Sequence, residues 1–231
     1  MTISYSQPPI QIEYPDEDGK PMAESDQARN YLLYGVEVLR MYFRERADVY
    51  VSGNLFIYYE EGNPYSVISP DVFVAFGVEK RDRRSYKTWE EGDKTPDFVL
   101  EITSKSTRSQ DQGAKKGIYS FLGVREYFQY DPTGDYLNPR LQGLHLVEAN
   151  YFPCSTTVLP DDITSIFSEV LGLELRLLPS GELRLYDPVT GKTLLTYEES
   201  EQARIEAEQR AKLAEARIAE LEAHLRALED R

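Results

Sequence analysis

A glutamate lies inside the most apolar strand-like segment of this chain, Phe98-Val99-Leu100-Glu101-Ile102. A second segment of the same kind, residues 71–76, begins at Asp71 directly after Pro70. Both segments are rich in the β-branched and aromatic residues that favour buried strands. Because a carboxylate is costly to bury without a partner, the two strands must bring these side chains to a cation, an ion-pair partner or solvent.

The segments around these strands predict an α/β core. Apolar residues recur at helical spacing from about residue 23 to 46, with Ser25 as the expected N-cap. A second helix is expected over residues 109–122, ending at Gly123. Strands are expected at residues 49–52, 55–59, 71–76, 98–103 and 126–130, and shorter ones at 144–147, 173–178 and 183–186. The order helix, strands, helix, strand over about residues 23–135 therefore continues into a β-rich part up to about residue 197.

The two ends of the chain differ from this core. Residues 1–22 are rich in Pro and acidic residues and predict an extended arm, which leaves residues 23–197 as the folded domain. Residues 198–231 contain no Gly or Pro, and Ala, Ile and Leu alternate there at spacings of four and three. This pattern predicts a coiled-coil helix that self-associates through residues 204–228 as a parallel homodimer. The alternative is that the helix folds back on its own domain or stays single.

The composition excludes several classes of protein. With one cysteine and two histidines, the chain has no internal disulfide and no Cys/His zinc site. Its 26 Lys and Arg against 40 Asp and Glu give a net charge of −14, which argues against coating nucleic acid by bulk charge. No apolar run reaches the roughly 18 residues of a membrane span, and the N-terminus has no basic segment followed by an apolar one. We expect a soluble, cytoplasmic protein with no membrane association.

Asp71 and Glu101 predict a metal site. An Asp and a Glu on neighbouring strands can converge on one hard divalent cation, because Mg²⁺ prefers carboxylate oxygens and water. A cation held in this way can activate water for phosphodiester hydrolysis. The alternatives are that Asp71 only begins a turn and that Glu101 forms a salt bridge or reaches solvent.

The second predicted helix carries polar side chains on one face. Asp111, Lys115 and Tyr119 follow one another at spacings of four, so all three project from the same side of the helix. This face could look towards the two carboxylates. The alternative is an exposed Asp111–Lys115 pair within the helix.

The ordered set of these residues resembles the restriction-endonuclease-like, or PD-(D/E)xK, fold, and within it the Uma-two family of proposed bacterial endonucleases. The matching residues, within about residues 24–132, are Pro70-Asp71-Val72, Pro96-Asp97 with residues 98–104, Ser106-Thr107, Asp111, Lys115, Tyr119, Gly123-Val124-Arg125-Glu126-Tyr127 and Asp131-Pro132. The resemblance implies a Mg²⁺- or Mn²⁺-dependent endonuclease that hydrolyses DNA, with Asp71 and Glu101 as metal ligands.

This chain departs from the usual motif at one position. The motif has a lysine two residues after the strand glutamate, where this chain has Thr103. The resemblance to members with a displaced lysine nominates Lys115 as the catalytic lysine, with Lys116 and Lys105 as weaker candidates. Glu24 is a candidate third carboxylate for catalysis and metal binding, although an acidic residue near a helix N-terminus is also favoured by the helix dipole.

Substrate contact needs local positive charge. The densest basic run, Lys80, Arg81, Arg83, Arg84 and Lys87, falls between the two carboxylate strands and could contact a DNA backbone or be an ordinary solvated surface. Asn54, beside Gly53, is either a turn residue or an amide that lines the site, and we favour the turn. His145 and Cys154 are interpreted as structural. The competing function is a non-catalytic interaction protein with a degenerate nuclease fold, supported by the acidic charge and by Thr103.

Overall fold

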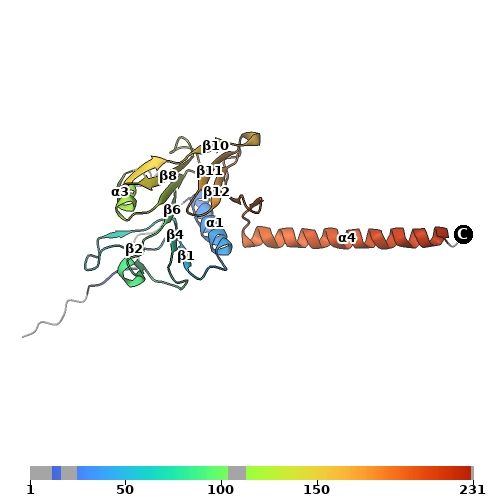
Figure 1. Ribbon diagram of the computed structural model, residues 1–231, viewed down its shortest axis with the longest axis horizontal. Helices are drawn as coiled ribbons and strands as arrows, with labels where there is room; N and C mark the ends of the chain where they lie inside the picture. Colours follow the sequence, from blue (N-terminus) through green and yellow to red (C-terminus); the bar gives the residue numbers. More distant parts are fainter. Residues whose placement is uncertain (1–11, 17–24, 104–112, 230–231) are drawn as a thin grey trace, which may run out of the picture. The chain divides into compact units, whose positions relative to one another are not determined.

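The computed structural model describes residues 12–16, 25–103 and 113–229. The chain divides into two compact units, Met1–Leu194 and Leu195–Arg231, and each is described by itself. The first unit is a mixed α/β structure (Figure 1). Within the described residues, no helix is both long enough and apolar enough to cross a membrane.

A six-stranded sheet forms the centre of the first unit. Its strands lie in the order β1-β4-β6-β7-β8-β9. Their bounds are Val49–Ser52 for β1, Val72–Phe76 for β4, Phe98–Ile102 for β6, Glu126–Tyr130 for β7, Leu141–Val147 for β8 and Asn150–Pro153 for β9. Strands β6 and β7 are parallel, whereas the other neighbours are antiparallel. The strands expected at residues 49–52 and 126–130 are confirmed with these bounds.

Helix α1, Asp26–Tyr42, packs on one face of this sheet. It begins as expected, because the Ser25 side chain accepts a hydrogen bond from the N–H of Ala28 at 3.2 Å. It ends before the expected residue 46, because Phe43 leaves the helical path to enter the core, where it is 6% exposed. Helix α3, Ala114–Phe121, packs on the opposite face, and Figure 1 shows the sheet between the two helices. The expected start of this helix at residue 109 lies outside the described residues.

A second, five-stranded antiparallel sheet covers the other side of α1. It comprises β10 (Thr156–Val158), β11 (Thr164–Ser168), β12 (Leu173–Leu177), β13 (Leu183–Asp187) and β14 (Lys192–Thr193), in chain order. Leucines of β12 and β13 share one core with α1, and the hydroxyl of Tyr34 accepts a hydrogen bond from the N–H of Leu185 at 3.0 Å. Helix α1 therefore lies between two sheets. The second sheet is the β-rich continuation that the sequence predicted.

Short elements complete this unit. Strands β3 (Val67–Ile68), β2 (Ile57–Tyr58) and β5 (Tyr86–Lys87) form a small sheet, and the 3-10 helices η1 (Thr88–Glu91) and η2 (Pro160–Asp162) lie in loops. The strand expected at residues 55–59 is thus reduced to β2.

The second unit consists mainly of helix α4, Tyr197–Glu229. Thr196 and Glu199 form a reciprocal cap: the Thr196 Oγ1 accepts from the N–H of Glu199 at 3.1 Å, and the Glu199 carboxylate accepts from the N–H of Thr196 at 2.9 Å. This cap fixes the start of the helix. Ile218 and Leu221 are exposed along it.

Candidate active site

The sheet brings Asp71 and Glu101 together. Val72 of β4 pairs with Leu100 of β6 in an antiparallel register, so Asp71, one residue before, lies opposite Glu101, one residue after. Directly opposed side chains on antiparallel strands project from the same face, with Cβ atoms about 4.5–5.5 Å apart. Asp71 Oδ2 also accepts a hydrogen bond from the N–H of Ile102 at 2.7 Å. The predicted convergence of the two carboxylates is therefore present.

Helix α3 closes the site over Glu101. Lys115 Nζ lies 2.8 Å from Glu101 Oε2, and the Tyr119 hydroxyl donates to Glu101 Oε1 at 2.5 Å. The side chain of Glu101 is 0% exposed and that of Lys115 only 15% exposed, so the ion pair is shielded from water. The predicted helix face is observed for Lys115 and Tyr119, whereas Asp111 lies outside the described residues.

Burial and like charge govern the protonation of the carboxylates. The pKa of Asp71 is raised well above its ordinary value, first by burial and then by the negative charge of Glu101, while Lys115 and the N–H of Ile102 oppose this effect. The pKa of Tyr119 is also raised, first by burial and then by Glu101. Its hydroxyl therefore stays protonated and donates a hydrogen bond to the Glu101 carboxylate. Two carboxylates beside one lysine leave an excess of negative charge that a proton or a cation can neutralise.

The donor set fits one hard divalent cation. Asp71 and Glu101 offer carboxylate oxygens, the ligands that Mg²⁺ and Mn²⁺ prefer, and Mg²⁺ commonly completes its coordination with water and substrate phosphate. The described residues contain no cluster of three or more His, Cys, Asp or Glu that could hold a metal ion. The predicted third carboxylate, Glu24, lies outside the described residues, so the described site has two carboxylates.

The lysine candidates differ in position. Lys115 contacts Glu101, whereas Lys116, the next residue along α3, forms no ion pair with any described carboxylate. Lys105 lies outside the described residues. The pairing of Lys115 with Glu101 depends on the packing of α3 against the sheet, which spacing along the helix could suggest but not determine.

The backbone of Asp71 packs against a glycine directly after β1, Gly53, whose role the sequence did not indicate. A Cβ atom on Gly53 would lie 2.1 Å from the carbonyl oxygen of Asp71, so only glycine allows this close approach. The next residue, Asn54, has a φ of 48° and donates its N–H to the carbonyl of Pro70 at 2.9 Å. Asn54 is therefore the turn residue that the sequence indicated. The pair Gly53-Asn54 holds the Pro70-Asp71 segment in place.

The basic run is mostly paired with carboxylates. Arg81 and Arg83 contact Glu91, Arg84 contacts Asp16, and Lys87 contacts Glu90. These pairs neutralise most of the charge that the sequence offered for DNA contact. Lys80 is the exception within the described residues: its Nζ donates to the carbonyl oxygens of Phe43 at 3.0 Å and Arg44 at 3.2 Å, without a carboxylate partner.

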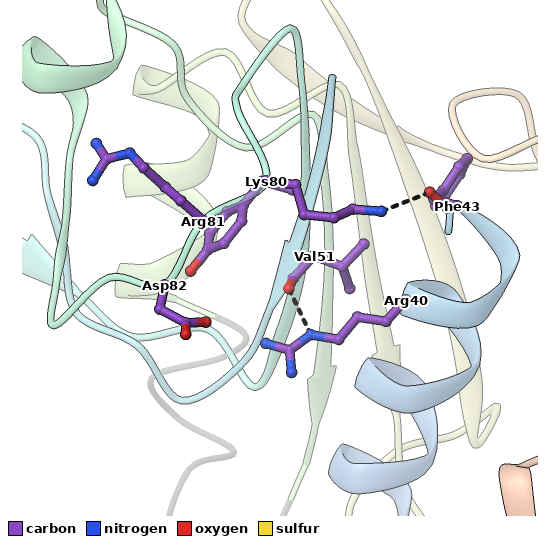
Figure 2. Close-up of a pocket in the computed structure, with 7 residues that line it drawn as sticks. Arg40, Phe43, Val51, Lys80, Arg81 and Asp82 are labelled. Atoms are coloured by element: carbon purple, nitrogen blue, oxygen red, sulfur yellow. Dashed lines mark hydrogen bonds between the residues drawn. The ribbon is translucent and has the colours of Figure 1, made fainter. Parts of the chain in front are cut away.

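Lys80 and Arg40 line a cavity of about 380 Å³ near the edge strand β1 (Figure 2). Arg40 Nε donates to the carbonyl oxygen of Val51 at 3.0 Å, and it too has no ion-pair partner among the described carboxylates. The other lining residues are Phe43, Tyr50, Val51, Arg81 and Asp82. Main-chain oxygens fix Arg40 and Lys80 without neutralising them, so these two cations outnumber the one carboxylate of the lining, Asp82.

His145 and Cys154 have structural surroundings. His145 lies on β8 and Cys154 directly follows β9, and the Cys154 Sγ and His145 Nδ1 atoms are 3.9 Å apart. Burial raises the pKa of the Cys154 thiol to about 11, which disfavours the reactive thiolate. These contacts agree with the structural interpretation of both residues.

Two of three comparisons relate the chain to known proteins. The crystal structure of a putative nuclease belonging to DUF820 from Anabaena variabilis ATCC 29413 is similar, with a TM-score of 0.42 and 14% sequence identity, over 63% of this chain and 80% of that chain. No curated protein matches. Residues 3–178 match the sequence model of the Uma2 family, the Uma-two family of the sequence analysis, which is described as "Putative restriction endonuclease". Because the match spans well over half of the chain, this protein belongs to the Uma2 family.

Proposed function

We propose that this protein is a Mg²⁺- or Mn²⁺-dependent endonuclease that hydrolyses phosphodiester bonds in DNA. The observation that carries the proposal is the Asp71–Glu101 pair, in which Glu101 is fully buried and contacts Lys115 and Tyr119. Membership of the Uma2 family supports a nuclease, and hence a nucleic-acid substrate.

Each side chain has a distinct role in this proposal. Asp71 and Glu101 would hold the divalent cation, which would supply Lewis-acid stabilisation and a more acidic bound water. Tyr119 holds Glu101 in one orientation through its 2.5 Å hydrogen bond. Lys115 supplies positive charge next to the reacting groups, where it would stabilise developing negative charge on oxygen. Glu24 remains a candidate third ligand.

The cavity beside β1 is the proposed contact for the DNA backbone. Arg40 and Lys80 keep unused N–H donors and their full charge, which is what a phosphate group requires. The two cations compensate locally for the net charge of −14. They bind phosphate without reading sequence.

A second candidate function is a non-catalytic interaction protein with a degenerate nuclease fold. Thr103 in place of the usual lysine and the acidic composition favour it. In this alternative, parallel self-association through residues 204–228 of the tail would be the main activity, and the carboxylate pair would have no chemical role.

The decisive experiment measures cleavage of supercoiled DNA, linear DNA and RNA with Mg²⁺, Mn²⁺ or EDTA. We expect the wild-type protein to cleave DNA only with a divalent cation, and Asp71→Ala and Glu101→Ala to abolish cleavage while the fold is retained. Glu61→Ala, an exposed acidic residue of a surface loop, is the matched control and should leave the rate unchanged. Wild-type rates in both site variants would exclude this site. A wild-type protein with no activity on any substrate would favour the interaction protein.

A further inference from the structure

Two buried polar atoms have no hydrogen-bond partner among the described residues. They are Thr103 Oγ1 and Gln129 Nε2, and their residues are 1% and 4% exposed. Buried polar groups in folded proteins are nearly always satisfied, because leaving them unpaired costs free energy. An unpaired buried donor therefore marks a place where a ligand or a water molecule belongs.

Gln129 lies next to the candidate active site. It pairs directly with Glu101 in the parallel ladder of β6 and β7, so the two side chains project from the same face of the sheet. Glu101 is in turn opposite Asp71, the residue directly before β4. Asp71, Glu101 and Gln129 thus form a row across three neighbouring strands.

Thr103 extends the same face along the chain. It stands two residues after Glu101, so the alternation of a strand places both side chains on one side. The N–H of Thr103 donates to the carbonyl oxygen of Tyr130 at 2.7 Å, which continues the β6–β7 pairing to this residue and fixes its backbone. Thr103 and Gln129 therefore lie on adjacent strands beside the carboxylate pair.

The helix side confirms which face this is. Tyr119 of α3 donates to Glu101, and its ring packs on Tyr127, two residues before Gln129, with ring centroids 5.1 Å apart. Lys115 comes from the same helix. The two unpaired atoms therefore face the side of the sheet that carries all of the described groups of the candidate site.

The chemistry of the two atoms selects an oxygen ligand. An amide nitrogen only donates a hydrogen bond, and a hydroxyl either donates or accepts. One oxygen atom can satisfy both, whether it belongs to a water molecule or to a phosphate. Neutral donors have a further use at this place, because the neighbouring carboxylates repel an anionic oxygen and cannot bind it themselves.

We propose that Thr103 and Gln129 form a neutral subsite that binds one oxygen atom of the reacting groups, either the attacking water or an oxygen of the scissile phosphate. This inference rests on the proposed nuclease function. Both residues bind and orient that oxygen through hydrogen bonds, and neither acts as a general acid or base. The competing explanation is a water molecule with a purely structural role.

Shape-conserving variants separate these explanations. Thr103→Val and Gln129→Leu remove the polar groups but keep the volume, so the melting temperature should stay at or above that of the wild type. Each should lower kcat/KM for DNA by about tenfold or more, as the loss of a positioned donor does. Thr103→Ser keeps the hydroxyl and should retain activity within about threefold. Gln142→Leu is the matched control, since Gln142 is the next residue in the row and its amide already donates to the carbonyl of Pro139 at 3.1 Å.

The kinetic pattern identifies the source of the oxygen. A lower kcat at unchanged KM assigns the subsite to the attacking water. A raised KM assigns the subsite to phosphate. In that case inorganic phosphate, added with Ca²⁺, should raise the melting temperature of the wild type but not that of Thr103→Val or Gln129→Leu. Wild-type kcat and KM in both Thr103→Val and Gln129→Leu, or an equal loss in Gln142→Leu, would overturn the inference.

A binding measurement keeps this test separate from the proposed function. The side-chain amide signals of Gln129 in ¹H–¹⁵N NMR spectra, identified by their loss in Gln129→Leu, should shift when Mg²⁺ and inorganic phosphate are added together. Unshifted signals in a wild-type protein that cleaves DNA defeat the subsite alone. A wild-type protein that cleaves no substrate defeats the proposed function, whatever these signals do.

Discussion

The two faces of the six-stranded sheet bury a glutamate each, and the partners of the two glutamates differ. On the α1 face, Glu126 accepts hydrogen bonds from the Ser168 hydroxyl, the N–H of Glu169 at 2.8 Å and the N–H of Val170 at 3.3 Å. These are neutral donors from β11 and the turn that follows it, and they tie the two sheets together. On the α3 face, Glu101 instead meets the charge of Lys115 and the hydroxyl of Tyr119.

The rest of each face follows the same division. Every even-numbered residue of β6 faces α1 and is apolar, namely Phe98, Leu100 and Ile102. The odd positions face α3, where Val99 is apolar but Glu101 is not. The polar side chains of the α3 face are collected at one end of the strands, beside unpaired donors. Both faces therefore bury an apolar core, and the α3 face in addition carries the polar groups of the candidate site.

The largest expected effect on the cleavage rate is at Lys115, on the α3 face. Replacing Lys115 with alanine should lower the cleavage rate by about 10²-fold or more, because the charge beside Glu101 is lost. Lys116→Ala should lose little, since Lys116 points about 100° away around the helix. Single-turnover cleavage of DNA measures both. A larger loss in Lys116→Ala would assign the role to Lys116, and small equal losses would remove α3 from the chemistry.

A stability comparison tests the division between the faces directly. Leu39→Ala removes a fully buried α1 side chain and should cost about 2–5 kcal/mol of unfolding free energy while leaving kcat per folded molecule unchanged. Glu101→Gln should have the opposite profile: no cleavage, and a metal-free stability close to that of the wild type, because the relief of repulsion with Asp71 offsets the loss of the ion pair with Lys115. Denaturant unfolding with parallel activity assays measures both. A large loss of stability in Glu101→Gln would make the carboxylate pair structural.

The pH dependence of stability follows from the raised pKa of Asp71. The folded-state pKa lies above the ordinary value of 3.8, so the native state binds this proton more tightly than the unfolded state does. The stability associated with the proton is fully present below pH 3.8 and is lost as the pH rises from there through the raised pKa. The difference in melting temperature between wild type and Asp71→Asn, measured without metal across this range, should therefore grow in favour of the variant with rising pH. A saturating divalent cation should reduce this trend, and a flat difference without metal would contradict the assignment.

Sequence alone predicted the parts of the site that lie on strongly patterned elements. Asp71 and Glu101 stand out because a carboxylate breaks an apolar strand, and Lys115 stands out through its helical spacing. Gln129 carried no such signal, because its place beside Glu101 comes from the pairing of β6 with β7, two strands separated along the chain by helix α3. Gly53 was missed for a similar reason, since its role depends on a close approach to Asp71. Strand β10 is exposed throughout, so it lacks the apolar alternation by which strands are recognised.

A smaller effect is expected at the cavity beside the edge strand β1, whose lining includes residues from the cores of both faces. Arg40→Gln and Lys80→Gln should each weaken DNA binding severalfold and reduce the slope of log K against log salt by about 1, because each removes one phosphate contact. Fluorescence anisotropy with the inactive Asp71→Ala variant measures binding without cleavage. Arg44→Gln is the control, since the Arg44 side chain is 72% exposed and already pairs with Glu45. Equal salt slopes in all three variants would remove the cavity from DNA binding.

The smallest expected effect concerns the tail, whose helix α4 we expect to pair weakly with that of a second copy. With Ala211, Ile218 and Leu225 at the a positions of the heptad, glutamates occupy the e positions, and Arg210, Arg217 and His224 occupy the g positions. A parallel pair sets each g residue against a glutamate of the partner helix, whereas an antiparallel pair sets glutamate against glutamate. The parallel arrangement is therefore favoured by attraction and by avoided repulsion.

The seam of the tail limits the strength of this pairing. Its first half is rich in alanine and buries little area, so the dimer should be held mainly by the second half and should dissociate at micromolar concentration and at raised salt. Analytical ultracentrifugation should show a concentration-dependent dimer for the full chain and a monomer for a chain that ends at Tyr197. Ile218→Asp in the full chain should give the same monomer, because it places a charge in the seam while leaving the rest of the protein intact. If the full chain and the shortened chain both sediment as monomers, or both as the same dimer, the tail is not the element that joins two copies.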